Sequence, residues 1–134
     1  MICFTRKYNF FTMKKIPNNK NMNNSIIKYD DFEKVKILTG TILEVTENIK
    51  ARKPAYVLKI DFGEKAGIKF SSAQITNYSI EELINRQVVA VCNFEKKNIA
   101  GIESEVLVLG SIDQDNKVIL LQPDVLVKNG SPVA

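Results

Sequence analysis

Two short segments of the sequence concentrate cations that could bind phosphate oxygens. The first covers residues 49–54 and the second covers residues 95–105. Their cations are Lys50, Arg52, Lys53, Lys96 and Lys97. Guanidinium and ammonium groups make charge-assisted hydrogen bonds to phosphate. A cation on a loop has no role in a hydrophobic core, so Arg52 and Lys97 are the strongest candidates for phosphate contacts.

The residues that most enzymes use for acid–base or nucleophilic chemistry are scarce. The chain contains no histidine, which removes Ser-His-Asp and Cys-His catalysis and most zinc sites. It has no paired carboxylates in a setting that would shift their pKa, and no glycine-rich loop for a nucleotide phosphate. We therefore predict a protein that is not an enzyme and that uses no metal and no cofactor.

The two cysteines, Cys3 and Cys92, are too few and too far apart to indicate a disulfide framework. A reducing compartment, the cytoplasm, fits them better. Cys92 lies in an apolar stretch and is predicted to be a small buried side chain, because no histidine could activate it as a nucleophile.

Length and composition predict one globular domain. The chain has 134 residues, of which 45% are hydrophobic, enough for one core. No apolar run approaches the roughly 18 residues of a membrane-spanning helix. All 15 acidic residues lie at or after Asp30, so residues 30–134 have a net charge of −2 and residues 1–29 a net charge of +6. Bulk charge therefore gives no argument for nucleic-acid binding by the folded part.

Residues 1–29 differ in composition from the rest, with Asn and Lys runs and no acidic residue. Three interpretations remain open: a disordered basic leader, a targeting peptide, or non-native sequence upstream of a start at Met13 or Met22. The scarcity of Ser and Arg disfavours targeting. We take residues 30–134 as the folded domain.

The pattern of apolar residues in that domain predicts an all-β fold. Strands are expected at residues 36–48, 56–62, 68–74, 88–94 and 106–110, with a further strand at 117–121. Gly40 in the first strand suggests a bulge or a sharp bend, and residues 63–67 suggest a hairpin turn. Ser79 and Glu82 form a capping box that begins a short helix ending near Asn85.

Five strands with a short helix between the third and fourth is the order of elements in an OB-fold, a five-stranded barrel. The strand at 117–121 would be a C-terminal extension. OB-folds bind oligonucleotides on their second and third strands, helped by the loops that join strands one to two and four to five. Those two loops are the cation-rich residues 49–54 and 95–105.

Six stretches also resemble motifs of the free-standing tRNA-binding domain family, most closely its CsaA branch. They are DFEKVKILTGTI, ARKPAYVLKIDFG, SSAQIT, VCNF, IAGIESEVLVLG and LLQPD, and the resemblance covers about Asp31 to the C-terminus. The resemblance implies an OB-fold homodimer that binds tRNA and catalyses no reaction. It also implies a possible second role, since CsaA proteins are described as chaperones linked to protein export that bind unfolded polypeptides.

The resemblance also implies a tRNA-binding surface. Carried over motif by motif, its residues are Arg52, Lys53, Ser71, Ser72, Gln74, Asn93, Phe94, Lys96, Lys97, Ser104 and Glu105. Phe94, next to the second cation cluster, could stack on a base. Glu95 follows it where many relatives have prolines and an arginine, and this carboxylate weakens the local positive field.

An apolar segment continues beyond the predicted barrel and indicates self-association. Val125, Leu126 and Val127, together with Phe32 near the other end, would make an unusual exposed patch on a monomer. We expect them to form a two-fold interface between two copies. The alternative function, a chaperone that binds peptides for export, would use an apolar groove of this dimer.

Overall fold

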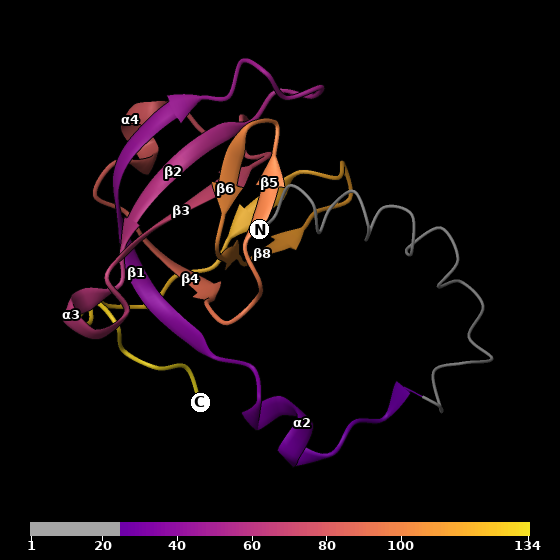
Figure 1. The fold of residues 1–134 in the computed structure, drawn as a ribbon, viewed down its shortest axis with the longest axis vertical. Coiled ribbons are helices and arrows are strands. Elements are labelled where there is room, and N and C mark those ends of the chain that lie inside the picture. The colour runs from indigo at the N-terminus through magenta and orange to yellow at the C-terminus, as the bar shows by residue number, and fades with distance from the viewer. Residues whose placement is uncertain (1–24) are drawn as a thin grey trace.

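The structure is a computed structural model and describes residues 25–134; the predictions for residues 1–24 lie outside this range. Figure 1 shows a strand-rich barrel with three short helices in the described part. The helices are α2 (Tyr29–Glu33), α3 (Gly63–Ala66) and α4 (Ile80–Leu83). The strands are β1 (Ile37–Glu47), β2 (Tyr56–Asp61), β3 (Ile68–Ala73), β4 (Gln87–Val91), β5 (Lys97–Ile99), β6 (Ile102–Ser104), β7 (Leu107–Val108), β8 (Gly110–Ile112) and β9 (Val118–Leu120).

Five strands form one antiparallel sheet in the order β3-β2-β1-β4-β7. The sheet curls until β3 meets the chain just before β7. There the Glu105 backbone N–H donates to the Phe70 carbonyl at 2.9 Å, and the Ser71 hydroxyl donates to the Val106 carbonyl at 3.2 Å. These contacts nearly close the barrel, and the predicted all-β OB-fold with a short helix between β3 and β4 is confirmed.

The core follows from alternation along the strands. In β2, Tyr56, Leu58 and Ile60 are buried, whereas Val57, Lys59 and Asp61 face outward and are only partly covered. Inward-facing side chains of the other strands pack with these residues, with Phe62 after β2 and with Leu83 of α4 in one hydrophobic cluster. Burial of this apolar surface stabilises the barrel that carries the loops.

One local prediction needs correction. The register shift of β1 lies at Leu43, between Ile42 and Glu44, while Gly40 pairs regularly with Val88. A Cβ on Gly40 would lie 2.7 Å from the Phe62 ring, so the glycine provides room for that ring and makes no bulge. The predicted hairpin turn at residues 63–67 is confirmed, because β2 and β3 pair antiparallel up to Asp61 and Ile68, and the helical turn α3 lies in the loop between them.

Helix α4 begins as the capping box predicts. The Glu82 backbone N–H donates to Ser79 Oγ at 3.2 Å, and the Ser79 N–H donates to Glu82 Oε1 at 3.1 Å. The helix ends at Leu83, two residues before the predicted end. Asn85 has a φ of 67°, a left-handed conformation that a helix interior does not allow.

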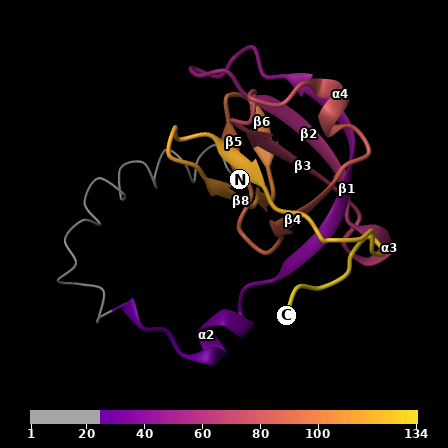
Figure 2. The same ribbon diagram turned by 180° about the vertical axis from the view of Figure 1, so that it is seen from behind.

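The C-terminal part is a separate hairpin followed by a long extended segment. Gly110 begins β8, so the predicted fifth strand is reduced to β7, and β8 pairs with β9. After β9 the chain returns to the start of β1, where the Thr39 N–H donates to the Ser131 carbonyl and the Val133 N–H to the Ile37 carbonyl, both at 2.9 Å. Figures 1 and 2 show the C-terminus beside the start of β1, with α2 projecting away from the barrel on the chain that leads into β1.

Candidate nucleic-acid interface

The two cation-rich segments lie at one end of the barrel. Residues 49–54 follow β1, and most of the predicted loop 95–105 is the hairpin of β5 and β6, whose turn is at Ala100 and Gly101 (Figure 1). A Cβ on Gly101 would lie 3.5 Å from Lys50 Cδ, so the first segment contacts the hairpin turn. The fold therefore joins both segments into one surface.

Asn48 fixes this arrangement from within. Its side chain is buried, and its amide lies 3.3 Å from Ser72 Oγ on β3 and 3.5 Å from the Ile99 carbonyl on β5. One amide thus connects the start of the first loop, the sheet and the hairpin. This role is not visible in the sequence, because an asparagine after a strand most often indicates a turn.

Asn48→Ala is expected to lower the free energy of unfolding by about 1–3 kcal/mol, because it leaves buried polar groups without a donor. It should also increase hydrogen exchange in β5 and β6. Urea denaturation and native-state exchange measure both effects. Gln114→Ala, at an exposed turn position, should change stability by less than about 0.5 kcal/mol. Equal effects of the two substitutions would contradict the proposed link.

Three predicted site residues are buried serines that support the surface through hydrogen bonds beneath it. Ser71 and Ser72 have no exposed area and Ser104 is 3% exposed. The Ser72 backbone N–H donates to Ser104 Oγ at 3.3 Å, and the Ser71 hydroxyl bonds to the Val106 carbonyl. These hydroxyls hold β6 and the chain after it against β3.

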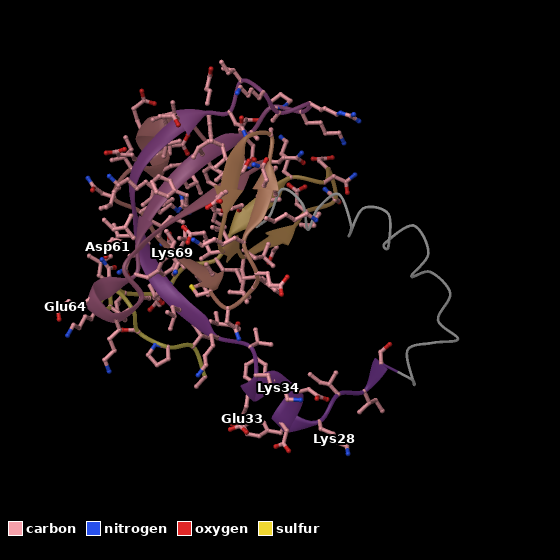
Figure 3. All side chains as sticks on the ribbon, in the orientation of Figure 1. Lys28, Glu33, Lys34, Asp61, Glu64 and Lys69 are labelled. Atoms are coloured by element: carbon pink, nitrogen blue, oxygen red, sulfur yellow. The ribbon has the colours of Figure 1, made fainter. Side chains whose placement is uncertain are left out.

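Glu105 is the centre of a small ion-pair network. Its carboxylate lies 3.6 Å from Lys96 Nζ and 4.0 Å from Lys69 Nζ, and it accepts a hydrogen bond from the Phe70 backbone N–H at 3.3 Å. Lys96 also lies 4.0 Å from Glu103. Figure 3 labels Lys69, which the sequence analysis missed, on the curved sheet. Part of the positive charge of Lys96 is therefore already balanced by carboxylates.

Arg52, Lys53 and Lys97 are exposed on the loop and on the first residue of β5. Gln74 follows β3 at the end where Ala73 pairs with Tyr56, next to the first loop, and is partly exposed. These four predicted residues thus share the end of the barrel that the two cation-rich segments form.

Asn93 and Phe94 lie elsewhere. Asn93 accepts from the Lys36 N–H at 2.9 Å and donates to the Lys34 carbonyl at 2.7 Å, so it anchors the chain between α2 and β1. Residues 49–54 follow the opposite end of β1. Phe94, the next residue, is 49% exposed. The structure therefore does not bring these two residues together with Arg52.

Among residues 25–134, no group of histidine, cysteine, aspartate or glutamate side chains is arranged to hold a metal ion. Within the same range, no helix is long and apolar enough to cross a membrane. Burial raises the pKa of the Cys92 thiol to about 11, an effect that nearby Lys69 only partly opposes. The thiol is thus protonated at neutral pH and a poor nucleophile.

Comparison with known families agrees with this fold and these motifs. Residues 37–132 match the family described as "Putative tRNA binding domain". The chain belongs to this tRNA-binding domain family. The match spans the barrel from β1 to the C-terminal segment that returns beside it.

Two solved structures are similar over their whole length. The CsaA chaperone protein of Picrophilus torridus is 52% identical, with a TM-score of 0.78 over 81% of this chain and 100% of its own. The chaperone CsaA of Bacillus anthracis is 44% identical, with a TM-score of 0.77 over 82% of this chain and 100% of its own. The predicted resemblance to the CsaA branch is confirmed.

Curated relatives include much longer proteins. A methionine–tRNA ligase of Pyrococcus abyssi is 36% identical over 98% of this chain, which corresponds to 18% of the ligase. The chain therefore spans less than a fifth of that relative.

Proposed function

We propose that this protein binds tRNA in the cytoplasm as a non-catalytic OB-fold module, through residues 49–54 and the β5–β6 hairpin. The observation that supports this most is the meeting of the two cation-rich segments at one end of a tRNA-binding domain, at Lys50 and Gly101. Because residues 30–134 have a net charge of −2, a few placed cations must supply the attraction.

The predicted site residues divide into two roles in this proposal. Arg52, Lys53 and Lys97 contact phosphates, and Gln74 adds a polar contact beside them. The residues that hold the surface in shape are Ser71, Ser72, Ser104 and Glu105. Glu103 and Glu105 compete with phosphate for Lys96, which lowers its contribution. Asn93 and Phe94 reach tRNA only if it extends along the barrel to the far end of β1.

The proposal is tested by measuring tRNA affinity over a range of salt concentrations. Each phosphate contact contributes about 0.7–0.9 to the slope of log K against log salt. A slope of at least about 2 is expected if three cations bind phosphates. Binding that is absent, or that does not depend on salt, would contradict the proposed site.

A second candidate function is binding of unfolded polypeptides, possible alongside the first and supported by the two solved relatives that are named as chaperones. It would use apolar side chains of a dimer, so its affinity would change little with salt. A fluorescently labelled unfolded polypeptide tested across the same salt series distinguishes the two functions.

We also propose that the protein is a homodimer. Helix α2 has five residues, none of them buried, and it lies away from the barrel (Figures 1 and 3). A single helical turn is not stable in water without packing. Phe32 on this helix is 36% exposed, and Leu126 in the C-terminal segment is 83% exposed. A second copy that covers both would supply the missing contacts.

Light scattering at micromolar concentration is expected to give twice the 15.1 kDa mass of one chain. Substituting both Val125 and Leu126 with aspartate should shift the protein to a monomer, because charges would enter an apolar interface. Ile119→Asp, at an exposed apolar position on β9, is the matched control and should leave the dimer intact. A monomeric wild-type protein would overturn this proposal.

A further inference from the structure

The outer face of β3 has an unusual distribution of side chains. Phe70 is 38% exposed and Ile68 is 49% exposed, whereas Ser71, which faces the interior, is fully buried. In antiparallel pairs, directly opposite residues lie on the same face. Phe70 pairs with Lys59, which pairs with Glu44, and Lys59 Nζ lies 3.5 Å from the Glu44 carboxylate. The ring therefore faces outward beside an ion pair.

A second group of ion pairs contacts the backbone of Phe70. Its backbone N–H donates to Glu105, whose carboxylate also contacts Lys96 and Lys69. Lys59, Lys69 and Lys96 thus each have a carboxylate partner. This surface is nearly balanced in charge, so it offers a flat aromatic ring and little net attraction for phosphate.

We infer that Phe70 is a stacking platform for an unpaired base of the bound RNA. This inference rests on the proposed tRNA-binding function and adds a contact that the family motifs did not indicate. The ring lies on β3, one of the two strands on which OB-folds bind oligonucleotides. Aromatic side chains on such a face stack on splayed bases, and every base has a π-face to offer.

A base fits this surface better than a polypeptide does. On this face Phe70 and Ile68 lie opposite Lys59 and Asp61, respectively, so charged side chains border the apolar ones. A nucleotide places an apolar base on the ring, and its phosphates extend toward the exposed cations of the β5–β6 hairpin. The β5–β6 hairpin carries exposed cations of the proposed phosphate site. It lies next to β3, because the Ser72 N–H on β3 donates to Ser104 on β6.

Phe70→Leu is expected to weaken tRNA binding about tenfold, which is typical for the loss of one stacked base. The factor should be the same at every salt concentration, because no phosphate contact is lost. Phe70→Tyr keeps the ring and should bind nearly as the wild type does. Ile68→Ala, on the same face, should have little effect. Equal affinity of the leucine and tyrosine variants would overturn the inference and leave the proposed function standing.

The chain contains no tryptophan, so Phe70→Trp creates a single fluorescent reporter at the proposed contact. Total tRNA and a short single-stranded RNA should quench its emission, whereas an RNA duplex of equal length should not. Ile119→Trp, on β9, is the control and should not respond. Circular dichroism verifies that both variants fold.

Three fluorescence results would overturn the inference. Quenching by duplex RNA as strong as that by single strands would indicate simple proximity to the backbone. An unfolded polypeptide that changes the emission where RNA does not would assign the face to peptide binding. A change with protein concentration alone would indicate a contact between copies. If the wild type binds no tRNA at all, the proposed function fails together with the inference.

Discussion

Replacing Arg52 and Lys97 together with glutamate is expected to abolish tRNA binding while the protein stays folded. The two side chains lie on the two cation-rich segments and both are exposed. The change removes two phosphate contacts and adds two repulsive charges to a domain whose net charge is already −2 over residues 30–134. Any residual binding should show a salt slope smaller by about 1.5. If one tRNA bridges both subunits of a dimer, the slope should fall by about twice as much.

A charge-matched control separates site from bulk electrostatics. Lys65→Glu with Lys117→Glu makes the same change in net charge, but Lys65 is in α3 and Lys117 is in the turn before β9. Both are exposed and far along the chain from the two segments. This variant should bind tRNA with an unchanged slope. If the first double variant is folded and its slope equals that of the wild type, the RNA site lies elsewhere and polypeptide binding becomes the better-supported function.

The sequence predicted the elements whose signals are local. Strict alternation in residues 56–62 gave β2 and its buried face, and the Ser79–Glu82 pair gave the start of α4. The hairpin of β5 and β6 lies where the sequence predicts a loop. Its turn uses Ala100 and Gly101, with φ values of 51° and 85°. Alanine seldom adopts a positive φ, so this pair does not resemble the Asn-Gly turns that usually indicate a hairpin.

The site was only partly predictable because its supporting contacts join distant parts of the chain. The loop cations were visible as charges without a core role. The burial of Ser72 depends on Asn48 and Ser104, which lie 24 and 32 residues away. Phe70 was missed because Ile68 and Phe70 alternate with Lys69, a pattern that places the lysine outside, whereas in the structure the two apolar residues are exposed and Lys69 is partly buried. Which of these side chains are buried is therefore decided only when the barrel closes.

Phe62→Ala is expected to cause the largest loss of stability, about 3–5 kcal/mol, because it removes a ring that is 1% exposed at the centre of the core. Such a loss is a large share of the 5–15 kcal/mol typical of a folded domain. Urea denaturation with an unchanged m value measures it. Ile119→Ala, at an exposed position, should cost less than about 0.5 kcal/mol.

A substitution at Gly40 tests the packing of the Phe62 ring, because the ring occupies the space that a side chain at residue 40 would need. An ideal Cβ at Gly40 would lie 2.7 Å from two carbons of the ring and 2.8 Å from Ile60 Cγ2. Gly40→Ala in the wild type should therefore cost about 1–3 kcal/mol through overpacking. In the Phe62→Ala background the new methyl enters the cavity, so the same substitution should cost little or restore some stability. Changes in the free energy of unfolding are not additive for substitutions that share a cavity, whereas those at independent sites add within about 0.5 kcal/mol. Additive losses in the double variant would show that Gly40 and Phe62 do not compete for the same space.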